Sequence, residues 1–193
     1  MPLSKSDNRM PVHTRRVECF GYIREDGMWD IEGHMTDVKS YDFSNSHRGE
    51  IPMGEPVHDM WIRLTIDDSL MIHKAEASTD LSPYNICANI TPAYEQLAGI
   101  RIGSGWLNTV KKKLGGVHGC VHLTELLGPM ATTAFQTTWA SNSKGREIMG
   151  LAKREAKPRT GKPPLLNTCH SYRADGPVVK EFWPDFFESK EPS

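Results

Sequence analysis

Four segments in the first half of the chain alternate apolar and polar residues with the period of two that is typical of β-strands. The clearest runs from Met28 to Val38, where one parity is apolar and the other carries two acids and a histidine. Asp26-Gly27 is a strong hairpin signal before it. We expect strands at residues 14–25, 28–38, 57–66 and 70–78. Two hairpins in series predict an antiparallel sheet of about four strands.

After residue 80 the apolar spacing changes to the period of 3.6 that predicts helices. Thr91-Pro92 is a favourable helix start, Gly115-Gly116 is a helix end, and Gly128-Pro129 could kink or divide a longer helix. We expect helices at residues 92–98, 106–114 and 120–139. The fold class is therefore predicted to be α+β, with an N-terminal antiparallel sheet packed against about three helices and an extended C-terminal tail.

The length of 193 residues is typical of one domain, which we place at residues 12–185, with a flexible arm at 1–11 and a flexible tail at 186–193. Residues 39–56 are rich in turn-forming residues and have no period, which is typical of a lid or a binding loop. The segment 165–183 is expected to dock on the domain, because its large apolar side chains would otherwise be exposed.

Composition narrows the class of protein. Charged residues make up 24% and apolar residues 38%, and the formal net charge is -1, so nothing indicates nucleic-acid binding. The chain lacks a signal-peptide pattern and any apolar run long enough for a membrane span, which predicts a cytoplasmic protein with no membrane partner. Its four cysteines form no CxxC pair, so reduced thiols are expected. The phosphate-loop, GxGxxG, GxSxG and HExxH motifs are missing, which disfavours nucleotide-dependent chemistry.

The densest group of chemically useful side chains lies between Gly115 and Glu125. His122 and Glu125 are three positions apart, so a helix places their side chains next to each other. His118 precedes the same helix, whose dipole disfavours the charged form of its imidazole. This segment is the first candidate for an active site.

Several interpretations of this segment remain open. The His122–Glu125 pair could supply two ligands to zinc or iron, with Cys120 or His118 as a third. It could instead carry out acid/base catalysis without a metal, with Glu125 orienting His122. The glycines and the helix N-terminus could hold an anion. Finally, Glu125 could pair with a lysine or arginine, leaving His122 as a hydrogen-bonded, half-buried residue with no catalytic role.

Histidines in the predicted strands form a second set. His58 shares its parity with four apolar residues, and His73 shares its parity with a methionine and two alanines. Such histidines are usually hydrogen-bonded core residues, although either could line a pocket. His34 and Glu32 lie together on the polar parity, which is more typical of a solvated face.

A third set includes the dipeptide Cys169-His170, whose adjacent side chains point apart but could cap a pocket formed by other segments. Cys87, Cys120 and Cys169 come from three separate segments. If they converged with His122 they would form a metal site. As isolated thiols they are more often small buried residues.

Four segments carry a resemblance to a known family: HTRRVECFGYIREDGMWDIEGHMTD, GEPVHDMWIRLTIDD, GWLNTVKKKLGGVHGCVHLTELLGPMATTAFQT and CHSYRADGPVVKEFWP. Over most of residues 12 to 185 the chain resembles a bacterial family catalogued as domain of unknown function 2889. The resemblance implies one complete domain and brings no family-wide activity. It also suggests bacteria that degrade aromatic compounds, including lignin-derived dimers, in which small cofactor-free lyases are common.

Our leading hypothesis is a cofactor-independent lyase that acts on a small aromatic, for instance lignin-derived, compound. In this hypothesis His122 is the general base or acid, Glu125 orients it, and His118 assists. Substrate-binding candidates are His58, Tyr84, Arg63, Arg101 and Trp61.

The main alternative is a zinc- or iron-binding module or metalloenzyme, with ligands drawn from His118, Cys120, His122, Cys169 and His170. A further alternative is a non-catalytic protein that binds a small molecule or a partner. A homodimer is also considered, because the tail could exchange between subunits.

Overall fold

The computed structural model describes residues 3–140, 142–152 and 161–189. They divide into two compact units, one within Met1–Lys153 and the other within Arg154–Ser193. The single domain at residues 12–185 therefore stays a prediction. Residues 1–2 of the predicted arm and 190–193 of the predicted tail lie outside the described residues.

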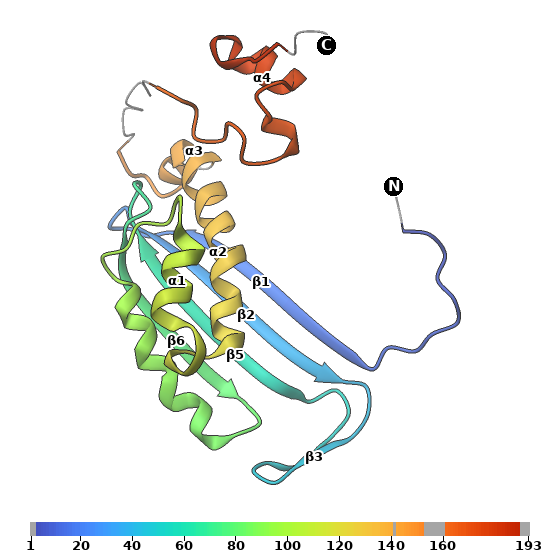
Figure 1. Cartoon of the computed structure of the whole chain (residues 1–193). Coiled ribbons are helices and arrows are strands. Elements are labelled where there is room, and N and C mark those ends of the chain that lie inside the picture. Colours follow the sequence, from blue (N-terminus) through green and yellow to red (C-terminus); the bar gives the residue numbers. More distant parts are fainter. Residues whose placement is uncertain (1–2, 141, 153–160, 190–193) are drawn as a thin grey trace. The chain divides into compact units, whose positions relative to one another are not determined.

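The first unit contains the predicted four-stranded antiparallel sheet, with the strand order β1-β2-β5-β6. Its hairpins β1–β2 and β5–β6 were both predicted, and β2 and β5 pair at the centre (Figure 1). The strands are β1 (His13–Ile23), β2 (Trp29–Lys39), β5 (Pro56–Ile66) and β6 (Ile72–Leu81). Strand β6 departs from simple alternation: Ile72 and Ala75 are both buried because a register shift interrupts the pairing with β5.

The segment between β2 and β5 contains regular structure that the sequence pattern did not predict. Strands β3 (Phe43–Asn45) and β4 (Gly49–Ile51) form a small separate hairpin. The Asn45 side chain accepts hydrogen bonds from the backbone N–H groups of the turn, and Arg48 donates to the carbonyl oxygen of Pro56. Strands of three residues are too short to show a period, so the hairpin is revealed only by its strand pairing and by these contacts.

Helices cover one face of the sheet, as Figure 1 shows for α1 and α2. Two of the three predicted helices are confirmed, and the longer one continues through Pro129 without being divided. The predicted helix at 92–98 is instead the end of a longer 3₁₀ stretch. The elements of this layer are η1 (Asn85–Leu97), α1 (Trp106–Leu114), η2 (Gly116–His118), α2 (Val121–Ala140) and α3 (Asn142–Ile148).

Helix α2 lies directly on the backbone of β1 and β2. Its apolar stripe is fully buried, at Leu123, Leu127 and Met130. Beneath it are two glycines, and a Cβ atom added at Gly33 would come within 2.6 Å of the sulfur of Met130. A Cβ atom at Gly21 would overlap the side chain of Thr137. These glycines therefore set how closely the helix approaches the sheet.

Gly21→Ala is expected to destabilise the first unit by about 1–3 kcal/mol, because the stiff, β-branched Thr137 side chain cannot move away without shifting α2. The free energy of unfolding from urea denaturation measures this loss. Gly103→Ala is the matched control, since nothing lies within 4 Å of its added Cβ atom. Equal stabilities of the two variants would contradict the close approach of α2.

The second unit is small and has its own apolar cluster, formed by Leu166, Ala174 and Val179 with Trp183, Phe186 and Phe187 packed against it. Its helical elements are η3 (His170–Tyr172), α4 (Pro177–Phe182) and η4 (Pro184–Phe186). The cluster partly buries the apolar residues of the segment 165–183. Docking of this segment on the domain stays a prediction.

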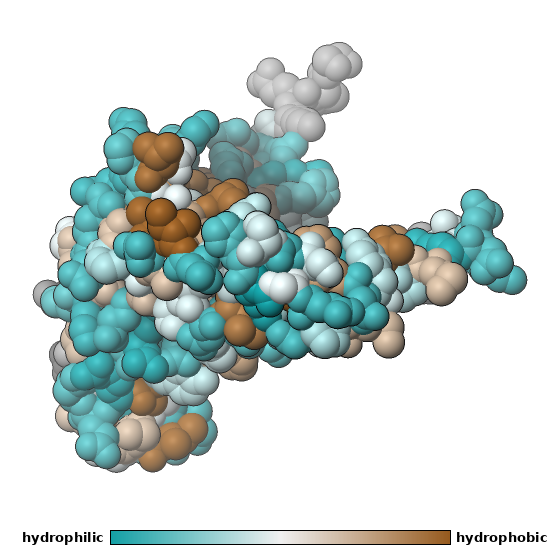
Figure 2. Space-filling view, turned by 90° about the horizontal axis from the view of Figure 1, so that it is seen from below, coloured by the Kyte–Doolittle hydropathy of each residue, from teal (hydrophilic) through white to brown (hydrophobic). Residues whose placement is uncertain are grey.

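Among the described residues, no helix is both long and apolar enough to cross a membrane. Figure 2 shows that hydrophilic residues cover most of the face seen from below, with hydrophobic residues in small separate groups. This distribution is typical of a water-exposed surface.

Candidate functional site

Three polar side chains form a row across the strands on the helix-covered face of the sheet. Arg15 of β1 lies opposite Asp37 of β2, and Asp37 lies opposite His58 of β5. Asp37 and His58 share the parity of the buried apolar residues of their strands, Arg15 shares that of the partly buried Cys19 and Ile23, and a register shift follows Asp37. Bulges of this kind often re-aim side chains at sites. The antiparallel register thus brings together residues that are more than 20 positions apart.

The Asp37 carboxylate is the centre of this row. Its side chain is only 2% exposed, and its two oxygens accept four hydrogen bonds. Arg15 donates two of them, each at 2.8 Å, in a bidentate arrangement. His13 Nε2 and His58 Nδ1 lie 3.1 and 3.0 Å from the carboxylate. An ionised carboxylate can only accept, so both imidazoles donate to it.

This arrangement determines the tautomer of His58. Because Nδ1 carries the proton that is donated to Asp37, the neutral ring has its lone pair at Nε2. The structure shows no hydrogen-bond partner for Nε2 of His58 among the described residues. A carboxylate that orients a histidine in this way prepares the opposite nitrogen to accept a proton or a metal.

A second imidazole comes from the first turn of α2. The ring centroids of His58 and His122 are 3.9 Å apart, with an angle of 35° between the rings. The start of α2 is anchored by the buried Tyr94, whose hydroxyl donates to the carbonyl oxygen of Cys120 at 2.9 Å and accepts from its N–H at 3.1 Å. A Cβ atom at Gly119 would overlap the Leu114 carbonyl, so the close approach of the chain to α1 just before α2 requires a glycine at this position.

The ionisation of the group follows from burial and from neighbouring charges. Burial would raise the pKa of Asp37, but hydrogen bonds from Arg15 and its charge, with the charges of His58 and His13, outweigh burial and lower this pKa to about 2. Burial and the nearby His122 lower the pKa of His58. Burial and the charge of Arg15 lower the pKa of His122. The site therefore holds an ionised carboxylate beside two imidazoles that favour the neutral form.

Glu125 lies on the same helix turn as His122 but makes a different contact from the predicted one. Its carboxylate accepts a hydrogen bond from Nη1 of Arg15 at 2.5 Å, and the described contacts include no hydrogen bond to His122. The sulfur of Cys120 lies 3.9 Å from Nδ1 of His122. Glu125 therefore acts on the cluster through Arg15.

Among the described residues, one group has the composition and spacing of a metal site: Asp37, His58 and His122 each offer a ligand atom, and these atoms lie within 4.8 Å of one another. The two imidazoles suit zinc or iron. Asp37 is less well suited to direct ligation, because its lone pairs already accept four hydrogen bonds. It fits better as the outer carboxylate that orients His58.

Two predicted substrate-binding residues lie on the opposite, uncovered face of the sheet. Arg63 donates to Glu32 at 2.7 Å, and the Trp61 ring stacks on His34 with centroids 3.8 Å apart. Both alternate with buried residues of β5, so the pleat directs them away from α2. The structure thus does not bring them to the cluster. Their predicted substrate contacts stay predictions, as does the solvated face expected for His34.

The remaining predicted residues are also separate from the cluster. Tyr84 is 51% exposed and makes an edge contact with His47. Arg101 donates to the carbonyl oxygen of Ser69, at the β5–β6 turn. His118 is exposed in η2, and the described contacts of its side chain include none to the cluster. Its catalytic assignment stays a prediction.

Of the cysteines and histidines considered as metal ligands, His122 belongs to the group that the described residues form, and Cys120 contacts it. Cys169 and His170 belong to the second unit. Cys87 is half-buried near the start of η1. All four cysteines are free thiols.

Arg15, Asp37 and His13 were missed by the analysis of the sequence. The sequence did contain a signal for Arg15 and Asp37. Each occupies the same parity as the apolar residues of its strand, where a charged side chain is unusual. A charge on the buried parity indicates either a partner within the fold or a site. The identity of that partner required the register.

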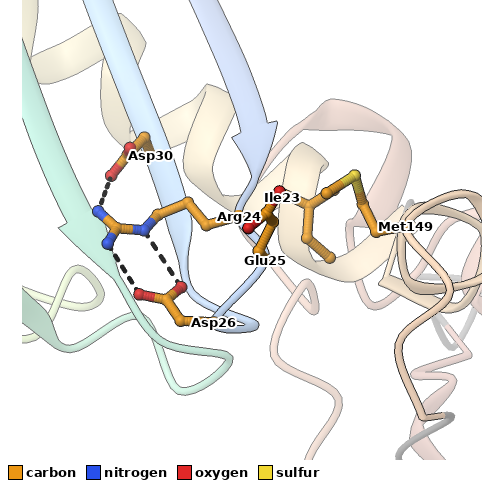
Figure 3. Close-up of a pocket in the computed structure, with 6 residues that line it drawn as sticks. All are labelled: Ile23, Arg24, Glu25, Asp26, Asp30 and Met149. Carbon is orange, nitrogen blue, oxygen red and sulfur yellow. Dashed lines mark hydrogen bonds and ion pairs between the residues drawn. The ribbon is translucent and has the colours of Figure 1, made fainter.

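A separate cavity of about 480 Å³ lies beside the β1–β2 turn and is lined by Ile23, Arg24, Glu25, Asp26, Asp30 and Met149 (Figure 3). Figure 3 shows Arg24 held between the carboxylates of Asp26 and Asp30. Arg24 offsets only part of the negative charge of Glu25, Asp26 and Asp30, and the cavity lining includes no histidine or thiol. It is a weaker candidate for chemistry than the cluster around Asp37.

The fold and the cluster define an α+β protein with an Arg–Asp–His row, centred on the buried Asp37, next to a second histidine on a helix. The chain belongs to the family described as protein of unknown function (DUF2889), whose model matches residues 13–136. That range includes every residue of the cluster, from His13 to Glu125. Searches of curated proteins and of solved structures found no match.

The depressed pKa of Asp37 predicts that the free energy of unfolding of the first unit falls at acid pH. Because the folded-state pKa is about 2 and the unfolded value is 3.8, the unfolded chain binds more protons between these values. The ionised Asp37 carboxylate therefore contributes about 2 kcal/mol to the free energy of unfolding above pH 4. This contribution is lost as the pH falls toward 2. Urea denaturation of the wild type and Asp37→Asn across this range measures it. Parallel pH profiles would contradict the prediction.

Proposed function

We propose that this cluster is the active centre of an enzyme that uses acid/base chemistry without a bound cofactor. The observation that supports it is the hydrogen bond from His58 Nδ1 to Asp37, which leaves Nε2 as a proton acceptor. The lowered pKa of His58 favours the neutral form, so the base is available near pH 7. In this proposal His58 takes the role of general base.

His122 is the second acid/base group in this proposal, because its ring is adjacent to that of His58. In the neutral pair, His58 removes a proton from the substrate, and the imidazolium so formed returns this proton to the leaving group, either directly or through the adjacent ring of His122. Arg15 and Glu125 are positioning residues: Arg15 orients Asp37, and Glu125 holds Arg15 from the helix side. In this proposal Glu125 positions Arg15, which differs from the role of orienting His122 that was expected from the sequence.

The reaction we propose is a lyase reaction on a small aromatic, for instance lignin-derived, compound. Such a reaction breaks a C–C or C–O bond without water, when a base removes a substrate proton and an acid protonates the leaving group. The aromatic substrate is an expectation carried over from the resemblance noted in the sequence. The four free thiols support a cytoplasmic location.

A metal centre is the second candidate function, and the spacing of Asp37, His58 and His122 favours it. Zinc or iron held by the two imidazoles would supply Lewis-acid chemistry, with Asp37 fixing the orientation of His58. Arg15 opposes this function, because a fixed guanidinium next to the site repels a cation.

The test uses the untagged full chain. Elemental analysis by mass spectrometry measures the metal content of the purified protein. Liquid chromatography measures turnover of a panel of phenolic dimers by the same preparation, before and after treatment with a chelator. Turnover without metal, lost in His58→Ala, is the expected result. About one zinc or iron per chain that is lost in His58→Ala would favour the metal centre. Tight binding of a compound or a protein without turnover would favour a non-catalytic protein.

A further inference from the structure

The outer edge of β1 is a long and regular strand edge, with no strand beside it in the described sheet (Figure 1). β1 pairs with β2 over residues 13–23 without a register shift, and it contains neither proline nor lysine. The one charged residue on its helix-covered face, Arg15, is already paired with Asp37 and Glu125. An edge of this kind is a template for another strand.

The opposite edge of the sheet, at β6, is protected. Two register shifts interrupt the pairing of β6 with β5. Ile72 donates a backbone hydrogen bond to Ile100 and accepts one from Gly99, so the chain after η1 covers the start of this edge. Bulges and covering segments are common ways in which proteins protect an edge strand. Of the two edges, β1 is therefore the one that is open to pairing.

The backbone of β1 presents every second residue to its open edge. At the two ends of the β1–β2 ladder, the carbonyl oxygen of Val12 accepts a hydrogen bond from Ser40, and the N–H of Arg24 donates to Met28. Bonding to one neighbour alternates along an antiparallel strand, so the even-numbered residues of β1 bond to β2 and the odd-numbered ones direct their N–H and C=O groups outwards. A further strand must therefore pair through the odd-numbered residues.

The side chains of β1 are self-complementary when two copies of the strand run antiparallel around Val17. Arg16 of each copy then lies opposite Glu18 of the other copy. Val17, which is 46% exposed, meets its own counterpart, and Val12 and Tyr22, which are 63% and 48% exposed, lie opposite each other. Cross-strand pairs of opposite charge and of apolar residues both stabilise a sheet. One register thus pairs the exposed apolar side chains of this edge with one another.

The two charges are available to a second strand. Arg16 is exposed and has no ion-pair partner among the described residues. Glu18 is 60% exposed, and its carboxylate lies 3.9 Å from Nδ1 of His34. Both side chains lie on the uncovered face of the sheet, where α2 does not obstruct them.

The same charges disfavour the neighbouring registers. Because pairing must use the odd-numbered residues of both copies, the next register in one direction sets Arg16 opposite Arg16 of the second copy. The next register in the other direction sets Glu18 opposite Glu18. Like charges directly opposite each other are destabilising. The charge pattern therefore selects the pairing centred on Val17.

We infer that two copies of this chain pair through β1, antiparallel and centred on Val17, to form one continuous sheet of eight strands. This surface differs from the exchange of the C-terminal tail that the sequence suggested. β1 also carries His13 and Arg15, so the cluster around Asp37 lies next to the interface in each copy. The inference does not rest on the proposed catalysis, because its test measures association.

Sedimentation velocity of the full chain tests the pairing. We expect a monomer–dimer equilibrium with a dissociation constant of about 1–100 μM, since one pair of strands makes a small interface. A chain that stays monomeric well above this range would leave the edge to a strand of another protein and would overturn the inference.

Charge reversal tests the register. Arg16→Glu and Glu18→Arg each set like charges opposite one another twice, so each should weaken the dimer about tenfold. An equimolar mixture of the two variants should dimerise like the wild type, because both opposite-charge pairs form again in the mixed dimer. Lys74→Glu, on the uncovered face of β6, is the matched control and should have no effect. Variants that do not rescue each other would contradict this register.

A cross-link tests the centre of the interface. Val17→Cys is made together with Cys169→Ser, which removes an exposed thiol. Hydrogen-bonded partners in antiparallel strands have Cα atoms about 5.5 Å apart, within the range of a disulfide, so oxidised glutathione should link two chains.

Cys169→Ser alone is the control for the cross-link, because the inferred register sets the two Cys19 residues about 13 Å apart along the strands. Circular dichroism checks the fold of each variant. A dimer that forms no link through Val17→Cys, or a control that links equally well, would overturn the inferred pairing.

Discussion

His58→Ala is expected to lower kcat by about 10²–10⁴-fold on any compound that the wild type turns over, because it removes the proposed general base. Although the imidazole is only 12% exposed, Asp37 keeps its contacts with Arg15 and His13, so the folded state should tolerate the change. Steady-state kinetics measure the effect, with circular dichroism as a check on folding. His122→Ala should act in the same direction.

The matched control for this variant is His73→Ala. His73 also contacts an aspartate, with Nε2 2.9 Å from Asp67, but the pair lies at the β5–β6 turn and the imidazole is 51% exposed. Its loss should leave kcat unchanged. A folded His58→Ala protein with wild-type kcat would exclude His58 as the base, and His118→Ala would then test the assignment made from the sequence.

Asp37→Ala is expected to lower the free energy of unfolding by about 2–4 kcal/mol at pH 7. Removing one partner of a buried ion pair leaves the other uncompensated, at a usual cost of about 3–5 kcal/mol. The range is discounted here because Arg15 is 34% exposed and keeps Glu125 as a partner. Urea denaturation followed by tryptophan fluorescence measures the loss.

Asp59→Ala is the control for Asp37→Ala. Asp59 contacts His34 at 2.7 Å on the uncovered face of the sheet, and its side chain is 26% exposed. Because water can replace this contact, the expected loss is below about 1 kcal/mol. A smaller loss for Asp37→Ala than for Asp59→Ala would mean that the carboxylate at the centre of the cluster contributes no net stability.

The sequence alone determined the class and the order of the elements of the first unit. Four strands and the two helices α1 and α2 were predicted from the spacing of apolar residues and from the turn- and cap-forming residues between them. This was possible because a buried face imposes apolar spacing that differs between strand and helix. The apolar parity of β2 and β5 also identified the face that α2 covers. The β3–β4 hairpin did not follow, since its strands are shorter than a period can reveal.

The tertiary structure alone decided which polar residues meet. The sequence indicated His122 and Glu125 as neighbours on one helix, but Glu125 contacts Arg15, which is 110 positions away. Asp37 meets Arg15 and His58 because the antiparallel register sets them opposite one another, and neither hairpin turn lies near them in sequence. Local spacing determines which face a side chain occupies, whereas its partners on that face depend on how strands and helices pair in space.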